Sequence, residues 1–348
     1  MFRPQLLVAR QFRHAVEKDF LEARPLSHKR ENWSGWRRSF SLEHEAFPVD
    51  EKTRATVMGI FALVFWGSTV AFSRSLTEKL GTFTSASYIF LLAGGLSCSY
   101  LIISRRLQRI LHVSKVYLLG CGALFVVYMV SLYLAIGIAT NRLQVLEVGL
   151  INYLWPSLTI VMTIPILKSK ARFTLIPGCL LGFGGVLLAS GQFGESWNAF
   201  FERLAGNWPP YALAFVAAVC WALYSNLARR WAREAEGGAV PLFLLASGLA
   251  LAGLRVTFPE RTDWTIQPVL ELVYMAVFSS VLAYTFWDIA MRRGNVALVA
   301  SLAYLTPLLS IVFGSLYLGV GIGRDLWAGC LLVIAGSITC KLSVKEDH

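Results

Sequence analysis

Tryptophan and tyrosine side chains recur deep inside the apolar runs of this chain. Two pairs, Trp221 with Tyr224 and Tyr284 with Trp287, are each spaced i, i+3, so each pair shares one helix face. Aromatic rings bind other rings and cations. A residue that only marks the bilayer interface lies near a helix end. The pattern indicates a cavity for a ring-bearing molecule, with ordinary helix packing as the alternative. The side chains concerned are Trp66, Tyr128, Trp221, Tyr224, Tyr284 and Trp287.

Two prolines stand at matching places in the two halves of the chain, in the motifs Tyr153-Leu-Trp-Pro156 and Tyr304-Leu-Thr-Pro307. A proline inside a helix removes a backbone donor and frees the carbonyl four residues earlier. Asn152 supplies one such carbonyl and a side-chain amide at the same level. We expect a kink at each proline, which is either static or a hinge between two states.

Carboxylates inside the apolar runs are few. Glu147, Glu271 and Asp288 all lie near the expected ends of helices. A carboxylate at the centre of a membrane costs roughly 2.5–3.5 kcal/mol on insertion scales, so it is normally functional. Near a helix end the cost falls, and an outward-pointing structural role is the alternative. Among the three, Glu147 is the candidate for proton coupling or for pairing with a substrate ammonium.

The sequence lacks the residue patterns that metal binding, disulfide frameworks, ATP hydrolysis and common hydrolytic reactions require. The six cysteines lie inside apolar runs without a C-x-x-C spacing, and the five histidines lie outside them. This argues against a metal site and a disulfide framework. The chain has no phosphate-binding G-x-x-x-x-G-K-[ST] loop, no nucleophile elbow and no H-E-x-x-H motif. We therefore expect no metal, no cofactor and no enzymatic activity.

The elements that position these side chains are ten apolar runs, each long enough to cross a hydrocarbon core about 30 Å thick as a helix. Apolar residues make up 56% of the chain, above the ~45–50% of soluble domains. The sequence predicts an all-α integral membrane protein. The runs are 55–73, 85–104, 116–139, 144–167, 173–190, 209–228, 240–258, 268–290, 296–319 and 325–341.

The basic residues predict an orientation. With the N-terminus in the cytoplasm, the inner segments hold 25 of the 32 Lys and Arg residues. This is the bias of the positive-inside rule, and it places both termini in the cytoplasm. Each half has five spans, so the second half is inverted relative to the first. The net charge of +11 is thus a mark of topology, and we expect no binding to nucleic acid.

The chain is duplicated. Besides the proline motifs, Gly178-Cys-Leu-Leu181 recurs as Gly329-Cys-Leu-Leu332. Such repeats are typical of transporters, whose substrate site lies between the halves. Gly178 and Gly182 form a small-x-x-x-small face, for which packing inside one subunit, and hence a monomer, is the expectation. The predicted parts are a mobile cytosolic tail (1–54), of which residues 1–50 are expected to be dispensable, repeats at 55–190 and 209–341, a periplasmic linker (191–208) and a cytosolic tail (342–348).

One string is more specific than these general features. Glu147-Val-Gly-Leu-Ile-Asn152-Tyr-Leu-Trp-Pro156, with the later aromatic pairs and Tyr304-Leu-Thr-Pro307, resembles the YddG-type aromatic amino acid exporters of the EamA group, in the drug/metabolite transporter superfamily. The similarity covers about residues 54–345. The resemblance implies ten helices in two inverted five-helix repeats around a central cavity, in the bacterial inner membrane. It implies that this cavity is lined by Trp66, Tyr128, Asn152, Tyr153, Trp155, Trp221, Tyr224, Tyr284, Trp287 and Tyr304.

Three functions stay open at this point. The first is a facilitated-diffusion exporter of aromatic and other bulky apolar amino acids, working by alternating access. The second is a proton-coupled drug or metabolite exporter of broad specificity, with Glu147 as its proton site. The third is a membrane protein that transports nothing. For the two exporters, the expected partners are a small-molecule substrate and the lipid bilayer.

Overall fold

The computed structural model describes residues 50–106, 113–189, 204–233, 238–318 and 324–345, together with residues 108 and 202. The chain divides into two compact units, Met1–Pro48 and Val49–His348, and all described residues belong to the second. The predicted N-terminal tail and the predicted linker 191–208 therefore lie largely outside the described residues.

Each of the ten apolar runs contains helix. In the first half the helices are α2 (Glu51–Gly67), α3 (Thr69–Leu80), α4 (Thr82–Ile103), the π-helix η1 (Tyr117–Cys121), α6 (Gly122–Gly137), α7 (Arg142–Asn152), α8 (Trp155–Leu167) and α9 (Leu175–Ala189). In the second half they are α11 (Pro209–Ala232), α12 (Val240–Thr257), α13 (Ile266–Tyr274), the π-helix η3 (Met275–Leu282), α14 (Ala283–Arg293), α15 (Val296–Leu302), α16 (Leu305–Leu318) and α17 (Arg324–Ser343). Short strands β1 (Lys170–Ala171) and β2 (Val344–Lys345) pair antiparallel.

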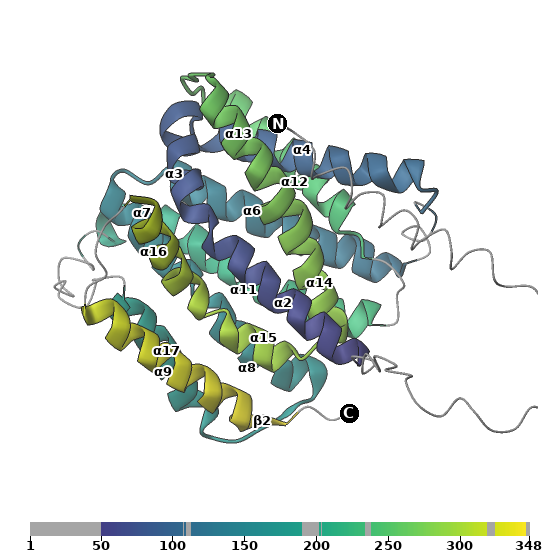
Figure 1. Cartoon of the computed structure of the whole chain (residues 1–348), viewed down its shortest axis with the longest axis vertical. Helices are drawn as coiled ribbons and strands as arrows, with labels where there is room; N and C mark the ends of the chain where they lie inside the picture. The colour runs from purple at the N-terminus through teal and green to yellow at the C-terminus, as the bar shows by residue number, and fades with distance from the viewer. Residues whose placement is uncertain are drawn as a thin grey trace, which may run out of the picture. The chain divides into compact units, whose positions relative to one another are not determined.

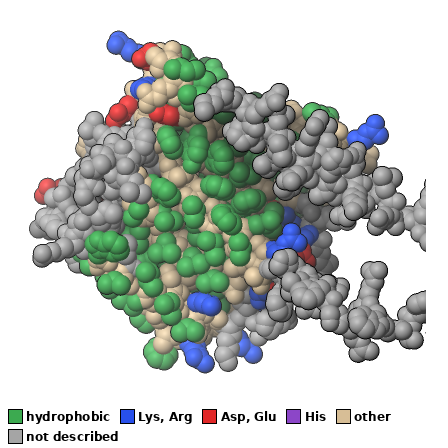
Figure 2. Space-filling view, in the orientation of Figure 1, with side chains coloured by type: hydrophobic (Ala, Val, Ile, Leu, Met, Phe, Trp, Pro, Cys, Tyr) green, Lys and Arg blue, Asp and Glu red, His purple; other side chains and the backbone are tan. Residues whose placement is uncertain are grey.

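The prediction of an all-helical membrane protein is confirmed. Within the described residues, five helical stretches are long and apolar enough to cross a membrane. These are Thr82–Ile103, Tyr117–Gly137, Pro209–Ala232, Val240–Thr257 and Ile266–Arg293. Shorter apolar helices accompany them, and the total of ten crossings stays a prediction. Figure 2 shows hydrophobic side chains spread over the middle of one face, with Lys and Arg along its lower edge.

Three of the runs are interrupted. The run containing Pro156 ends one helix at Asn152 and begins the next at Trp155, and its counterpart is broken between Leu302 and Leu305. Pro156 is the second residue of α8, where its missing N–H costs no intrahelical hydrogen bond. The first run also breaks, at Ser68, without any proline.

The packing of the helices is symmetric between the two halves of the chain. The main contacts between a helix of the first half and a helix of the second have counterparts between the corresponding helices. In order along the chain, α2 of the first half corresponds to α11 of the second, and α6 corresponds to α14. The structure packs α6 on α11 and α2 on α14, which are the same contact with the halves exchanged. Helices α4 and α12 correspond to each other and pack together, and so do α9 and α17 (Figure 1).

Glycines bring α9 and α17 into close contact. A Cβ atom added at Gly336 would lie 2.4 Å from the backbone nitrogen of Gly182, and one at Gly185 would lie 2.8 Å from the carbonyl oxygen of Gly329. One at Gly178 would meet the backbone nitrogen of Cys340 at 2.9 Å. The small face of Gly178 and Gly182 is thus occupied by packing within the chain.

Candidate functional site

The centre of the described unit holds an aromatic cluster built from both halves of the chain. Trp221 on α11 lies in its middle, with its ring centroid 4.6 Å from that of Tyr128 on α6 and 5.7 Å from that of Trp66 on α2. The cluster therefore joins residues that are far apart in sequence. We define the aromatic cluster as Trp66, Tyr128, Trp155, Trp221, Tyr224, Tyr284 and Trp287.

Two indole groups of the cluster donate hydrogen bonds to neighbouring helices. The indole of Trp66 donates to the carbonyl oxygen of Ser279 at 3.1 Å, and that of Trp287 donates to Oγ of Ser225 at 3.2 Å. Ser279 lies in the π-helix η3. A π-helical stretch disturbs the regular i→i−4 ladder, and such stretches are common at functional sites.

The rings fill the space between them. Trp221, Trp287 and Tyr224 are 2%, 0% and 0% exposed, whereas Trp66 and Tyr284 are half-buried. Rings at these centroid distances attract one another by about 0.5–1.5 kcal/mol beyond burial. In this conformation the aromatic rings pack against one another. A ring-bearing ligand would therefore have to replace some of these ring–ring contacts.

Two tyrosines predicted for the same cavity lie elsewhere. Tyr304 and Tyr153 pack together in a separate apolar group with Leu308 and Val333. The Tyr304 hydroxyl is hydrogen-bonded to Ser157. The structure thus brings seven of the ten predicted lining residues into one cluster and leaves this pair outside it. The remaining residue, Asn152, keeps a buried Oδ1 without a hydrogen-bond partner among the described residues.

Glu147 is buried inside the helical unit. Its side chain is 4% exposed, and its Oε2 accepts a hydrogen bond of 2.6 Å from the hydroxyl of Tyr211, itself 3% exposed. The pair joins α7 to α11. An outward-pointing position for Glu147 is therefore wrong.

The sequence analysis missed a polar network around Asp288. The Asp288 carboxylate is 1% exposed. Its Oδ1 accepts hydrogen bonds from Tyr117 at 2.9 Å and Tyr224 at 3.0 Å, and its Oδ2 pairs with Nε of Arg292 at 2.8 Å. The outward-pointing alternative is wrong for Asp288, because Arg292 and the two hydroxyls replace the solvent that a lone carboxylate needs. The i, i+4 spacing of Asp288 and Arg292 was the available signal.

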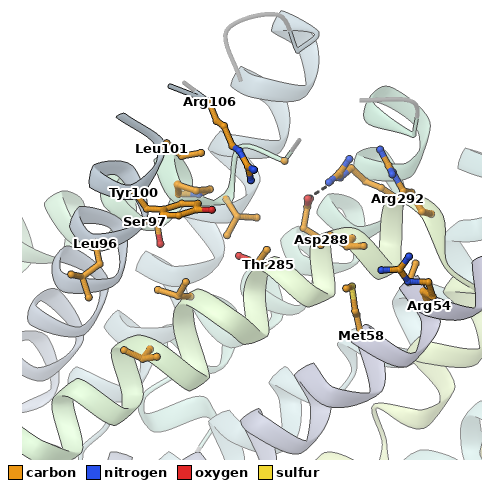
Figure 3. Close-up of a pocket in the computed structure, with 18 of the residues that line it drawn as sticks. Arg54, Met58, Leu96, Ser97, Tyr100, Leu101, Arg106, Thr285, Asp288 and Arg292 are labelled. Carbon is orange, nitrogen blue, oxygen red and sulfur yellow. Dashed lines mark hydrogen bonds and ion pairs between the residues drawn. The ribbon is translucent and has the colours of Figure 1, made fainter. Parts of the chain in front are cut away.

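A cavity of about 900 Å³ is lined by Asp288 and Arg292 of this network (Figure 3). Asp288 belongs to both regions, since it lines the cavity and binds Tyr224 of the aromatic cluster. None of the ten predicted lining residues borders this cavity. Its walls come from α2, the C-terminal half of α4, the start of α12, η3 and α14. Within the described residues, no three His, Cys, Asp or Glu side chains converge as metal ligands would.

Known proteins resemble this chain along most of its length. The EamA-like transporter family matches residues 53–191 and 208–340. The chain is 32% identical over 296 residues, 85% of its own length and 99% of the relative's, to "Aromatic amino acid exporter YddG" of Escherichia coli K12. It is also 32% identical, over 84% of this chain and 98% of the relative, to the protein of that name from Salmonella typhimurium. A solved crystal structure aligns with a TM-score of 0.70 at 27% identity, over 84% of this chain and 98% of that chain. The chain belongs to the EamA-like transporter family.

Proposed function

We propose that this chain exports aromatic and other bulky apolar amino acids across the bacterial inner membrane, as a facilitated-diffusion uniporter. The observation that carries the proposal is the aromatic cluster, to which helices of both halves contribute. The identity of 32% along nearly the whole of an aromatic amino acid exporter supports the same substrate class.

The cluster suits a substrate that must be released again. A substrate ring that enters between Trp66 and Trp221 replaces ring–ring contacts by contacts of the same kind, each about 0.5–1.5 kcal/mol beyond burial. The net gain is then small, and an exporter needs modest affinity to let its cargo leave. An indole face that the entering ring uncovers can also bind the substrate ammonium.

We propose ten spans in two inverted five-helix repeats, 55–190 and 209–341, with both termini in the cytoplasm. The exchange-symmetric packing of α6 on α11 and α2 on α14 supports the inversion, and so does the helix break at matching positions in each half. Single cysteines introduced in a cysteine-free chain test the orientation. Residues 105–115 and 229–233 are expected to resist a membrane-impermeant thiol reagent applied to the periplasmic side. Labelling there in sealed cells contradicts the orientation.

Counterflow in proteoliposomes tests the substrate class. Vesicles preloaded with phenylalanine, tyrosine, tryptophan, threonine or methionine are expected to accumulate labelled phenylalanine, and vesicles loaded with aspartate or lysine are not. The control is the same vesicles without protein. Absence of flux for every amino acid would support a membrane protein without transport activity.

A proton-coupled exporter of broad specificity is the second candidate. The observation that favours it is the buried carboxylate of Glu147, hydrogen-bonded to Tyr211. A protonophore separates the two proposals. Uphill export that collapses when the proton gradient is dissipated supports coupling, whereas a flux that follows only the amino acid gradient supports the uniporter.

A further inference from the structure

The cavity of Figure 3 has charged residues at one end and an apolar wall along its length. The charged lining residues are Glu51, Arg54, Arg106, Asp288, Arg292 and Arg293. The apolar lining includes Met58, Leu96, Leu101, Val277, Val281 and Ile289. The cavity is therefore amphipathic, and its ligand needs an ionic head and an apolar body.

The charge of this cavity is unbalanced toward the positive. Asp288 is paired with Arg292, and Glu51 is paired with Arg293. Arg54 and Arg106 make no ion pair with any described residue, and both reach toward the cavity from opposite sides (Figure 3). Two uncompensated guanidinium groups facing one space are suited to a phosphate, which Arg binds through paired N–H donors.

The apolar wall continues onto the lipid-facing surface. Leu96 and Tyr100 line the cavity while being 49% and 58% exposed, and Ile102 and Ile103 extend the same end of α4 at 62% and 81% exposure. In a multi-pass membrane protein such a surface contacts acyl chains. A free amino acid or a soluble phosphate uses only the charged end of this space, whereas an acyl chain also covers the apolar wall.

We propose that this cavity is a binding site for an anionic phospholipid, with its phosphate at the charged end that Arg54 and Arg106 line and one acyl chain along Leu96, Val277 and Val281. The site is separate from the aromatic cluster. A lipid bound next to the Asp288 network would contact the helix ends that hold Arg54 and Arg292. The lipid composition of the bilayer would then affect the packing of these helix ends. Basic pockets between membrane helices are known to bind anionic headgroups.

Native mass spectrometry of the purified full chain tests the site with phosphatidylglycerol as the probe and phosphatidylcholine as the neutral comparison. One phosphatidylglycerol molecule is expected to stay bound. Arg54→Gln with Arg106→Gln is expected to lower its retention about thirtyfold, because each basic residue near an anionic lipid contributes on the order of fivefold. Both side chains are exposed at the cavity rim, so the double variant is expected to fold.

The matched control is Lys170→Gln with Arg172→Gln, which removes two exposed positive charges away from the cavity. It is expected to retain phosphatidylglycerol like the unaltered chain. Equal loss in both double variants would mean general attraction to basic surface and would overturn the site. Equal retention of both lipids overturns it too, and displacement by soluble glycerol 3-phosphate at the same concentration would reassign the cavity to a free phosphate.

Discussion

The hydroxyl of Tyr224 donates a hydrogen bond of 3.0 Å to Oδ1 of Asp288, and both side chains are almost completely buried. Tyr224 stacks within the aromatic cluster, and Asp288 lines the adjacent cavity. One hydrogen bond thus connects the proposed substrate site to a buried ion pair at the end of α14. A change in the position of the Tyr224 ring necessarily changes the surroundings of the carboxylate.

Removing the charge of Asp288 is expected to destabilise the chain strongly. Asp288→Asn leaves Arg292 buried without its partner, and breaking a buried pair costs about 3–5 kcal/mol. Asp288→Leu combined with Arg292→Met removes both charges and is expected to recover only part of the loss, because the buried hydroxyls of Tyr117 and Tyr224 still lose their acceptor. Thermal unfolding in detergent measures both. Glu51→Gln, which breaks the exposed pair with Arg293, is the control and should change stability by less than about 1 kcal/mol. An unfolding temperature of Asp288→Asn equal to that of Glu51→Gln contradicts the prediction.

Truncating the two tryptophans of the cluster is expected to weaken substrate binding. Trp66→Ala and Trp221→Ala should each lower the apparent affinity for aromatic amino acids by about 1–3 kcal/mol, the scale of one large apolar contact. Trp221 is the more buried, so its loss should also cost more stability. Saturation kinetics in vesicles measure the affinity. Trp327→Ala, at a position 64% exposed, is the control. Unchanged affinity together with reduced stability in both cluster variants would identify them as packing residues.

Relieving the proline constraint in α8 is expected to slow turnover more than it weakens binding. Pro156→Ala restores a backbone N–H, which allows helix to continue across residues 153 and 154 and favours one conformation. Pro165→Ala is the matched control, since Pro165 lies in the same helix but is exposed. Comparing kcat with KM in the two variants tests the idea. It fails if both prolines affect turnover equally.

The Glu147→Gln variant tests whether transport follows the substrate gradient or is coupled to protons. If transport follows the substrate gradient, Glu147→Gln should leave downhill flux within about twofold of the unaltered chain, since the amide still accepts the Tyr211 hydrogen bond at modest cost. Tyr211→Phe is the companion variant, which removes the hydrogen bond and keeps the carboxylate. Uphill export driven by an imposed pH gradient and abolished only in Glu147→Gln would establish proton coupling.

The sequence predicted the positions of the helices well, because run length and apolar content are local properties. The run at 240–258 became α12, Val240–Thr257, and the break near Pro156 had a visible cause. The break at Ser68 did not. Its hydroxyl donates to the carbonyl of Phe65 and shares a hydrogen bond with Tyr274, a residue of the other half. Long-range contacts of this kind leave no periodic mark in the sequence.

The candidate site likewise has features that the local sequence predicts and features that depend on long-range contacts. The depth of Trp66 and Trp221 in their runs indicated a central position, and their rings lie in contact. No sequence pattern indicated that Tyr117 donates a hydrogen bond to Asp288, because the two residues are 171 positions apart. Burial of Asp288 depends on three partners from separate helices. Pairing across such distances is decided by the packed structure.

The glycine contacts between α9 and α17 limit what can move. With Gly336 against Gly182 and Gly185 against Gly329, the two backbones touch without intervening side chains. Sliding one helix along the other by a single residue would drive larger side chains into that seam. We therefore expect α9 and α17 to move together as one rigid unit. Under the proposed alternating-access mechanism, the remaining helices would carry the rearrangements that open and close the transport path.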